Sequence, residues 1–254
     1  MKKLLLLILL ALGTAAHSYE IETFDAPKSL FSEPTVTIRF AQPNANRVVI
    51  FLPGGTGNFV IPKEQGAPRG FGVVLNSISE SLGADVVVIN NPYPLNDLPG
   101  TWYPAMRDTN DHLTRIETIV RHYQRTHDVW LMGHSNGTFS ITAFMRRLEQ
   151  QKNVNLVKGI ILSGTRDVAQ FDRSPETRTL FVHHVKDACR VTSFADAQRN
   201  FTRIQQINSY KTEFVAVDSE GVSAGDPCHS GYHMMQGAHK ETANAIVNFI
   251  KGSP

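Results

Sequence analysis

The residues best suited to catalysis surround Ser135, in the segment Gly133-His134-Ser135-Asn136-Gly137. An apolar run at 129–132 precedes this segment and an amphipathic pattern at 138–148 follows it, so the sequence predicts strand, G-x-S-x-G and helix. In such a turn the glycines permit tight packing, and the serine hydroxyl is exposed beside a helix N-terminus that favours an oxyanion. We therefore predict that Ser135 is a nucleophile. The alternative is an ordinary strand-to-helix turn in which Ser135 only caps the helix.

A glycine-rich loop, Pro53-Gly54-Gly55-Thr56-Gly57-Asn58, follows an earlier apolar run at 47–52. Glycines let backbone N–H groups approach a ligand closely. We predict that the N–H of Asn136, together with one N–H from Gly55 or Thr56, binds the oxyanion. The alternatives are a flexible turn and a phosphate-binding loop, but the segment lacks the Lys-Ser/Thr ending of a P-loop.

A serine nucleophile needs a base, which a third group orients. In enzymes with this strand-to-helix serine turn, the acid and then the base follow the serine along the chain. Asp167 and Asp187 each follow a late apolar run, and we favour Asp187 because it follows the next-to-last one. Either residue could instead be a solvated loop carboxylate.

The base is expected in the loop between the last predicted strand and the last predicted helix. His229 and His233 both lie there, whereas His239 falls within the predicted helix, and we favour His233 with His229 as the alternative. The spacing of four residues between His229 and His233 also suits two zinc ligands on a helix. Gly231 between them argues against a helix, so we predict no metal. Three upstream histidines are interpreted as polar surface residues: His112, His122 and His127.

The N-terminus has the pattern of a secretory signal peptide over residues 1–16. Lys2 and Lys3 supply positive charge, an apolar run follows at 4–13, and Thr14-Ala15-Ala16 offers small residues for cleavage. The alternative, a membrane anchor, needs about 20 apolar residues. We predict an exported protein, periplasmic or secreted, whose mature chain is a single domain, 17–254.

The charge balance argues against several classes of partner. The chain has 25 basic and 23 acidic residues, and removing Lys2 and Lys3 with the signal peptide leaves 25 − 2 = 23 basic residues. A nearly neutral mature chain gives no reason to expect nucleic acid as a partner, and we predict no stable membrane insertion. The oligomeric state cannot be predicted from the sequence.

Two cysteines, Cys189 and Cys228, are present, and in an exported protein such a pair indicates one disulfide. The alternative is two separate thiols. Cys189 lies two residues after Asp187 and Cys228 lies five before His233. A disulfide would therefore connect the acid loop to the histidine loop.

Apolar runs alternate with amphipathic stretches along the chain, which predicts an α/β fold: a mostly parallel central sheet with helices on both faces and no large lid domain. The first run, 34–40, alternates with polar residues and is interpreted as an edge strand. Two irregular segments, 91–107 and 165–178, are expected to form loops over the substrate site, with Trp102, Tyr103 and Pro104 as candidate pocket walls. The other predicted strands are 47–52, 84–90, 129–132, 157–162, 179–182 and 213–217, and the predicted helices are 71–82, 109–123, 138–148, 193–207 and 238–250.

These motifs resemble those of the α/β-hydrolase family over nearly the whole mature chain. The sequence is also similar to a group of bacterial exported hydrolases with a Gly-Gly-x-Gly loop, a His-His-x-x-Asp-x-Cys segment and a second Cys before the histidine. Here these are Gly54 to Gly57, His183 to Cys189, and Cys228 to His233. The resemblance implies a Ser135–His233–Asp187 triad that acts on a small-molecule acyl substrate without a cofactor. An acyltransferase, a peptidase and an inactive binding protein of the same fold remain as alternatives.

Overall fold

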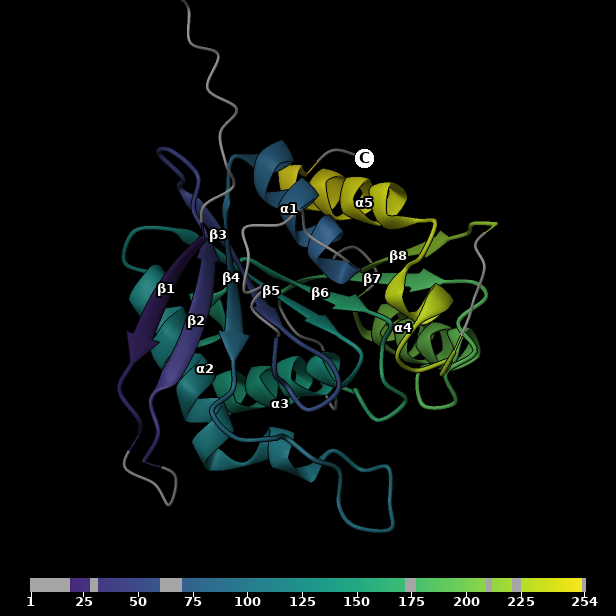
Figure 1. Ribbon diagram of the computed structural model, residues 1–254, viewed down its shortest axis with the longest axis horizontal. Coiled ribbons are helices and arrows are strands. Elements are labelled where there is room, and N and C mark those ends of the chain that lie inside the picture. The colour runs from purple at the N-terminus through teal and green to yellow at the C-terminus, as the bar shows by residue number, and fades with distance from the viewer. Residues whose placement is uncertain are drawn as a thin grey trace, which may run out of the picture.

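The computed structural model describes residues 19–27, 32–59, 70–171, 177–208, 212–220 and 225–252. These residues form one eight-stranded sheet that carries helices on both faces (Figure 1). The predicted signal peptide, residues 1–16, lies outside the described residues.

The sheet is mostly parallel, in the strand order β1-β2-β4-β3-β5-β6-β7-β8. Strand β2 runs antiparallel to its neighbours β1 and β4, and the strands from β4 to β8 are parallel to one another. The strands are β1 (Tyr19–Phe24), β2 (Thr35–Phe40), β3 (Arg47–Leu52), β4 (Asp85–Asn90), β5 (Asp128–His134), β6 (Gly159–Ser163), β7 (Arg178–His184) and β8 (Thr212–Val217).

Successive side chains of each strand point to opposite faces of the sheet, and apolar residues on both faces form two hydrophobic cores. In β3, Ile50 and Leu52 belong to one core and Val49 and Phe51 to the other. Helices α2 (Asn110–Tyr123), α3 (Asn136–Gln150) and α4 (Phe194–Asn208) cover the first face, and α1 (Phe71–Leu82) and α5 (His239–Lys251) cover the second (Figure 1). Short 3₁₀ helices are η1 (Ala105–Asp108), η2 (Val154–Leu156) and η4 (Gly231–Met234). The predicted α/β class is thus confirmed.

The structure corrects two predictions, one about the edge strand of the sheet and one about the start of a helix. Strand β2 is not an edge strand, because β1 pairs with its outer side. The sequence of β1 does not indicate an edge strand, because Glu20 and Glu22 interrupt its apolar residues. Both carboxylates form ion pairs with Arg39 of β2. Helix α3 begins at Asn136, two residues earlier than predicted, because it starts directly after Ser135.

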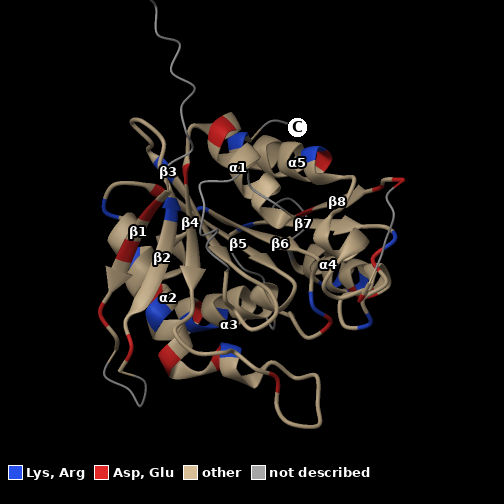
Figure 2. Cartoon of the chain, viewed as in Figure 1, with Lys and Arg blue, Asp and Glu red and all other residues tan. Residues whose placement is uncertain are grey.

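The connections between strands and helices within the described residues contain no separate lid domain. Acidic and basic residues are interspersed along the elements (Figure 2). None of the described helices combines the length and the apolar character that crossing a membrane requires.

Candidate active site

The sharp turn between β5 and α3 carries Ser135. Its backbone has φ 53° and ψ −125°, a strained conformation for a residue with a side chain. A Cβ on Gly137 would lie 2.0 Å from the carbonyl oxygen of Leu52, and one on Gly133 would lie 2.6 Å from the backbone of Gly137. The Ser135 N–H donates to the carbonyl of Ser163 at the end of β6 (3.0 Å). Both glycines of the motif are therefore required by packing, and the serine stands at the N-terminus of α3.

Asp187 and His233, the favoured acid and base, are in contact. Asp187 follows β7 and His233 lies in η4, and the distance from His233 Nδ1 to Asp187 Oδ2 is 2.9 Å. His233 is 1% exposed and Asp187 7% exposed. A carboxylate only accepts hydrogen bonds, so we assign the proton of the neutral imidazole to Nδ1. This assignment leaves Nε2 of His233 as a proton acceptor.

Two further donors hold the Asp187 carboxylate: its Oδ1 accepts from the Cys189 N–H (2.9 Å), and its Oδ2 accepts from the Thr192 hydroxyl (3.1 Å). The Thr165 N–H donates to His183 Nδ1, so the proton of that ring is on Nε2. This Nε2 donates to the carbonyl of Thr192 (2.8 Å) and lies 3.2 Å from Oδ2 of Asp187. Burial raises the pKa of Asp187, but hydrogen bonding and electrostatic attraction from His183 and His233 together outweigh burial and hold that pKa well below its ordinary value. The carboxylate is therefore charged at neutral pH.

The predicted disulfide between Cys189 and Cys228 is confirmed. Cys189 is buried next to Asp187, and Cys228 belongs to the segment that leads into η4. The bridge closes a loop with a sequence separation of 39 residues. It therefore connects the acid loop covalently to the segment that carries His233.

His233 lies beside the turn that holds Ser135. Its ring centroid is 4.8 Å from that of His134, the residue before Ser135. A Cβ on Gly164, which follows β6, would lie 3.4 Å from Cε1 of His233 and 3.0 Å from Cε1 of His134. Glycine at this position therefore lets the two rings approach. Within the described part of the chain, the Ser135 hydroxyl has no hydrogen-bond partner.

The glycine-rich loop after β3 lies directly against Ser135. A Cβ on Gly54 would be 2.9 Å from the Ser135 Cβ and 3.5 Å from its Oγ. The side-chain amide of Asn136 donates to the carbonyl of Gly55 (3.1 Å), which connects the loop to the start of α3. Among the described residues, no acceptor is bonded to the N–H of Gly55 or of Thr56. The two segments predicted to supply oxyanion donors are thus adjacent.

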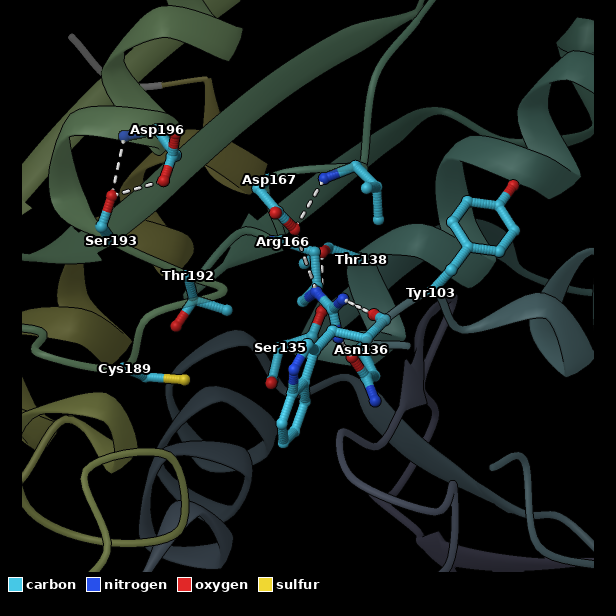
Figure 3. Close-up of polar contacts among 12 residues, drawn as sticks. Tyr103, Ser135, Asn136, Thr138, Arg166, Asp167, Cys189, Thr192, Ser193 and Asp196 are labelled. Atoms are coloured by element: carbon cyan, nitrogen blue, oxygen red, sulfur yellow. Dashed lines mark hydrogen bonds and ion pairs between the residues drawn. The ribbon is translucent and has the colours of Figure 1, made fainter. Parts of the chain in front are cut away.

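Two buried side chains beside the turn were not predicted from the sequence. His134 stacks on Phe71 with a centroid distance of 4.3 Å, and burial lowers its pKa well below the ordinary value, so the ring is neutral. Arg166 is 2% exposed and donates to the side-chain oxygen of Asn136 and to the carbonyl of Trp102 (Figure 3). The sequence does not indicate the burial of either residue, because arginine is mostly exposed and histidine intermediate in proteins, and their contacts depend on the packing around Ser135.

Arg166 ties the segment 91–107 to the site. The Arg190 guanidinium lies 3.5 Å from the centroid of the Trp102 ring, which is 58% exposed. Tyr103 packs edge-on against Phe139 of α3, whereas Pro104 is buried. Trp102 thus contacts the acid loop through Arg190 and is connected to Asn136, the residue that follows Ser135, through Arg166. Residues 172–176 of the second irregular segment lie outside the described residues.

His112 is buried, so the interpretation of it as a surface residue is wrong. Its Nε2 lies 3.0 Å from the Ser140 hydroxyl, and its Nδ1 lies 3.3 Å from the side-chain oxygen of Asn91. Burial lowers the pKa of His112 to about 3, and the neighbouring charge of Arg107 acts in the same direction. The ring is therefore neutral, and it belongs to a polar cluster beneath the glycine-rich loop.

The alternative acid and base lie apart from this arrangement. The side chain of Asp167 is 40% exposed and accepts from Arg166 and from the Val168 N–H. His229 is 75% exposed and pairs with Asp226 (3.4 Å). His239 is the first residue of α5 and bonds a backbone carbonyl. No cluster of three or more potential metal ligands occurs in the part of the chain that the structure describes.

The comparisons with known proteins agree with this architecture. No family model and no curated protein matches the sequence. Among solved structures, an α/β serine hydrolase without a lid from Xanthomonas campestris is 15% identical, with a TM-score of 0.58 over 92% of this chain and 94% of that one. A carboxyl esterase from Tuber melanosporum is 13% identical, with a TM-score of 0.63 over 94% and 89% of the two chains. A dienelactone hydrolase from Anabaena variabilis is 13% identical, with a TM-score of 0.62 over 93% and 98%. The protein therefore has the α/β-hydrolase fold.

Proposed function

We propose that this protein is a serine hydrolase that acts on a carboxylic ester or a related acyl substrate. In this proposal Ser135 is the nucleophile, His233 the general base and acid, and Asp187 the residue that orients His233. One observation carries the proposal: the strained Ser135 stands at the N-terminus of α3 beside a buried and hydrogen-bonded Asp187–His233 pair. A strained serine with an adjacent acid–base pair is typical of nucleophilic catalysis.

The reaction begins with proton transfer from the Ser135 hydroxyl to Nε2 of His233. The serine oxygen attacks the substrate carbonyl carbon, and the carbonyl oxygen becomes an oxyanion that the N–H groups of Asn136 and of Gly55 or Thr56 bind. The C–O bond to the leaving group then breaks, and His233 returns its proton to the departing oxygen. Water, activated by His233, releases the acid from the acyl-enzyme and restores Ser135.

The electrostatics of the acid–base pair support this sequence of steps. The proton on Nδ1 of His233 points at a carboxylate whose pKa is held low, so Asp187 stabilises the imidazolium that forms during proton transfer. The hydrogen bond between Ser135 and His233 is expected to form when substrate binds, because such contacts are commonly long in the free enzyme. His134 remains neutral beside His233 and so adds no opposing charge.

The nature of the acyl substrate is a further part of the proposal. Two of the solved neighbours are described as a carboxyl esterase and a dienelactone hydrolase, which favours an ester over an amide. A small-molecule substrate is favoured because the described residues contain no separate lid domain. An acyltransferase differs only in the acceptor of the acyl group, so the experiment below includes an alcohol.

We also propose that the chain is exported and that the mature protein, 17–254, is one domain. The N-terminal pattern of Lys2, Lys3 and the apolar run supports removal of residues 1–16. The disulfide between Cys189 and Cys228 supports an oxidising compartment. Protein recovered from the cell exterior or envelope should have the mass of residues 17–254, as measured by intact-protein mass spectrometry. Recovery of the uncleaved chain would contradict export by this route.

The test of the enzymatic proposal is pre-steady-state hydrolysis of p-nitrophenyl esters of increasing acyl length. We expect a burst of about one p-nitrophenol per chain followed by slower turnover, because an acyl-enzyme forms before water releases it. An added alcohol that is converted to a new ester would identify a transferase. Folded protein that shows neither a burst nor turnover with any ester would contradict the proposed function.

A further inference from the structure

A buried arginine lies beneath the glycine-rich loop and carries no role in the mechanism above. Arg107, in η1, is 1% exposed. Its Nη2 donates to the carbonyls of Gly54 (3.3 Å) and Gly55 (2.9 Å), and its Nη1 donates to the Ser140 hydroxyl (3.0 Å). One guanidinium therefore holds two successive peptide groups of the loop that lies against Ser135.

Because a peptide group is planar, the contacts of Arg107 with the two carbonyls also determine where the N–H groups of Gly55 and Thr56 point. In a trans peptide the carbonyl oxygen and the N–H of the next residue point in opposite directions. Because Arg107 binds the carbonyls of Gly54 and Gly55, the N–H groups of Gly55 and Thr56 point away from Arg107. Both N–H groups are without an acceptor among the described residues, as expected for donors reserved for a ligand.

Among the described residues no carboxylate is in direct contact with the Arg107 guanidinium, and Asp97 attracts it only from a longer distance. Within the described residues Arg107 forms no ion pair, and its Nε has no partner. Burial lowers the pKa of Arg107 to about 9, with Asp97 acting in the opposite direction, so the guanidinium is charged at neutral pH. The other base in the cluster, His112, is neutral. Burying a charge in this way is costly, which makes a purely structural role a poor explanation.

We propose that Arg107 is a positioning residue of the oxyanion hole. It holds the carbonyls of Gly54 and Gly55, so that the N–H groups of the same two peptides, those of Gly55 and Thr56, point toward the developing oxyanion. Charge-assisted hydrogen bonds to the two carbonyls also polarise these peptides and strengthen their N–H groups as donors. Arg107 does not touch the substrate in this arrangement. Its effect is thus expected in the transition state and not in ground-state binding. The inference rests on the proposed function.

The test compares substitutions of Arg107 with a matched substitution elsewhere. Arg107→Gln removes the positive charge and the planar set of N–H donors of the guanidinium. Arg107→Lys keeps the charge but lacks that planar set of donors. Arg115→Met is the control, because Arg115 is also 1% exposed and also binds a backbone carbonyl, that of Glu33 (2.7 Å). The values of kcat and KM are measured with one ester and normalised to active sites counted from the burst.

We expect Arg107→Gln to lower kcat by about 100-fold with KM within about threefold of wild type, as for the loss of one oxyanion donor. Arg107→Lys should recover part of kcat, whereas Arg115→Met should lose stability but keep kcat per active site. The inference is overturned if kcat of Arg107→Gln stays within about threefold of the control, or if only KM changes. If Arg107→Gln does not fold, wild-type kcat in Arg107→Lys overturns it.

The outcome separates this inference from the proposed function. Absence of a burst in the wild-type protein refutes the proposed function itself. A normal wild-type burst combined with unchanged kcat in the Arg107 variants refutes only the role of Arg107.

Discussion

His233→Ala is expected to lower kcat for ester hydrolysis by about 10⁶-fold, with little change in KM, because removal of the base from such a triad abolishes nearly all of its contribution. The physical reason is the position of the ring. Its Nδ1 is bonded to Asp187 at 2.9 Å, so its Nε2 is the group available to take the proton from Ser135. Steady-state kinetics on protein verified as folded by circular dichroism measure the effect.

The control is His229→Ala, which removes the other histidine of the same loop. The side chain of His229 is 75% exposed, and its ion-pair partner among the described residues is Asp226 at 3.4 Å, so its loss should leave kcat within about twofold of wild type. Substantial activity in His233→Ala together with a large loss in His229→Ala would reverse the assignment of the base.

Asp187→Asn is expected to lower kcat by about 10⁴-fold, because an amide in place of the carboxylate allows the wrong tautomer of His233 and does not stabilise the imidazolium. A fall of this size with KM nearly unchanged would identify a residue that acts in the transition state. The same assay applied to Asp167→Asn is the control. The side chain of Asp167 is 40% exposed and pairs with Arg166, not with His233 or Ser135, so activity should be nearly retained.

The same variant has an expected signature in stability. The pKa of Asp187 is lower in the folded protein than its ordinary value of 3.8, so the unfolded chain takes up the proton first as pH falls. The contribution of Asp187 to the free energy of unfolding is therefore complete above the ordinary pKa and is lost as pH falls through the folded-state pKa. The stability difference between wild type and Asp187→Asn should accordingly narrow below about pH 4. A constant difference across that range would contradict the charged state assigned to Asp187.

Local patterns account for the parts of the fold that were predicted from the sequence. The central strands β3, β4 and β5 are continuous apolar runs, because they are buried on both faces, and such runs are easily recognised. Strand β1 was missed because it is exposed on one side and carries Glu20 and Glu22, whose partner Arg39 is distant in sequence. An edge strand that depends on ion pairs with a later segment leaves little local signal.

The candidate site likewise contains some residues that local sequence patterns indicate and others that they do not. Ser135 was recognisable because its turn demands glycines at fixed positions, and Asp187 and His233 because they follow late strands in a known order. The burial of Arg107 and His112 could not be recognised, since arginine is mostly exposed in proteins, histidine is intermediate, and nothing in their sequence neighbours indicates burial. Their contacts with Asn91 and Ser140 form only in the folded chain.

Covalent labelling with a fluorophosphonate is the sharpest test of the claim that Ser135 is an activated nucleophile. The folded protein is treated with the reagent, digested and mapped by mass spectrometry, beside Ser135→Ala and the control Ser79→Ala, which removes a buried hydroxyl in α1. We predict one adduct, on the peptide that contains Ser135, absent in Ser135→Ala and unchanged in Ser79→Ala. An adduct on another residue, or no adduct on folded wild-type protein, would contradict the claim.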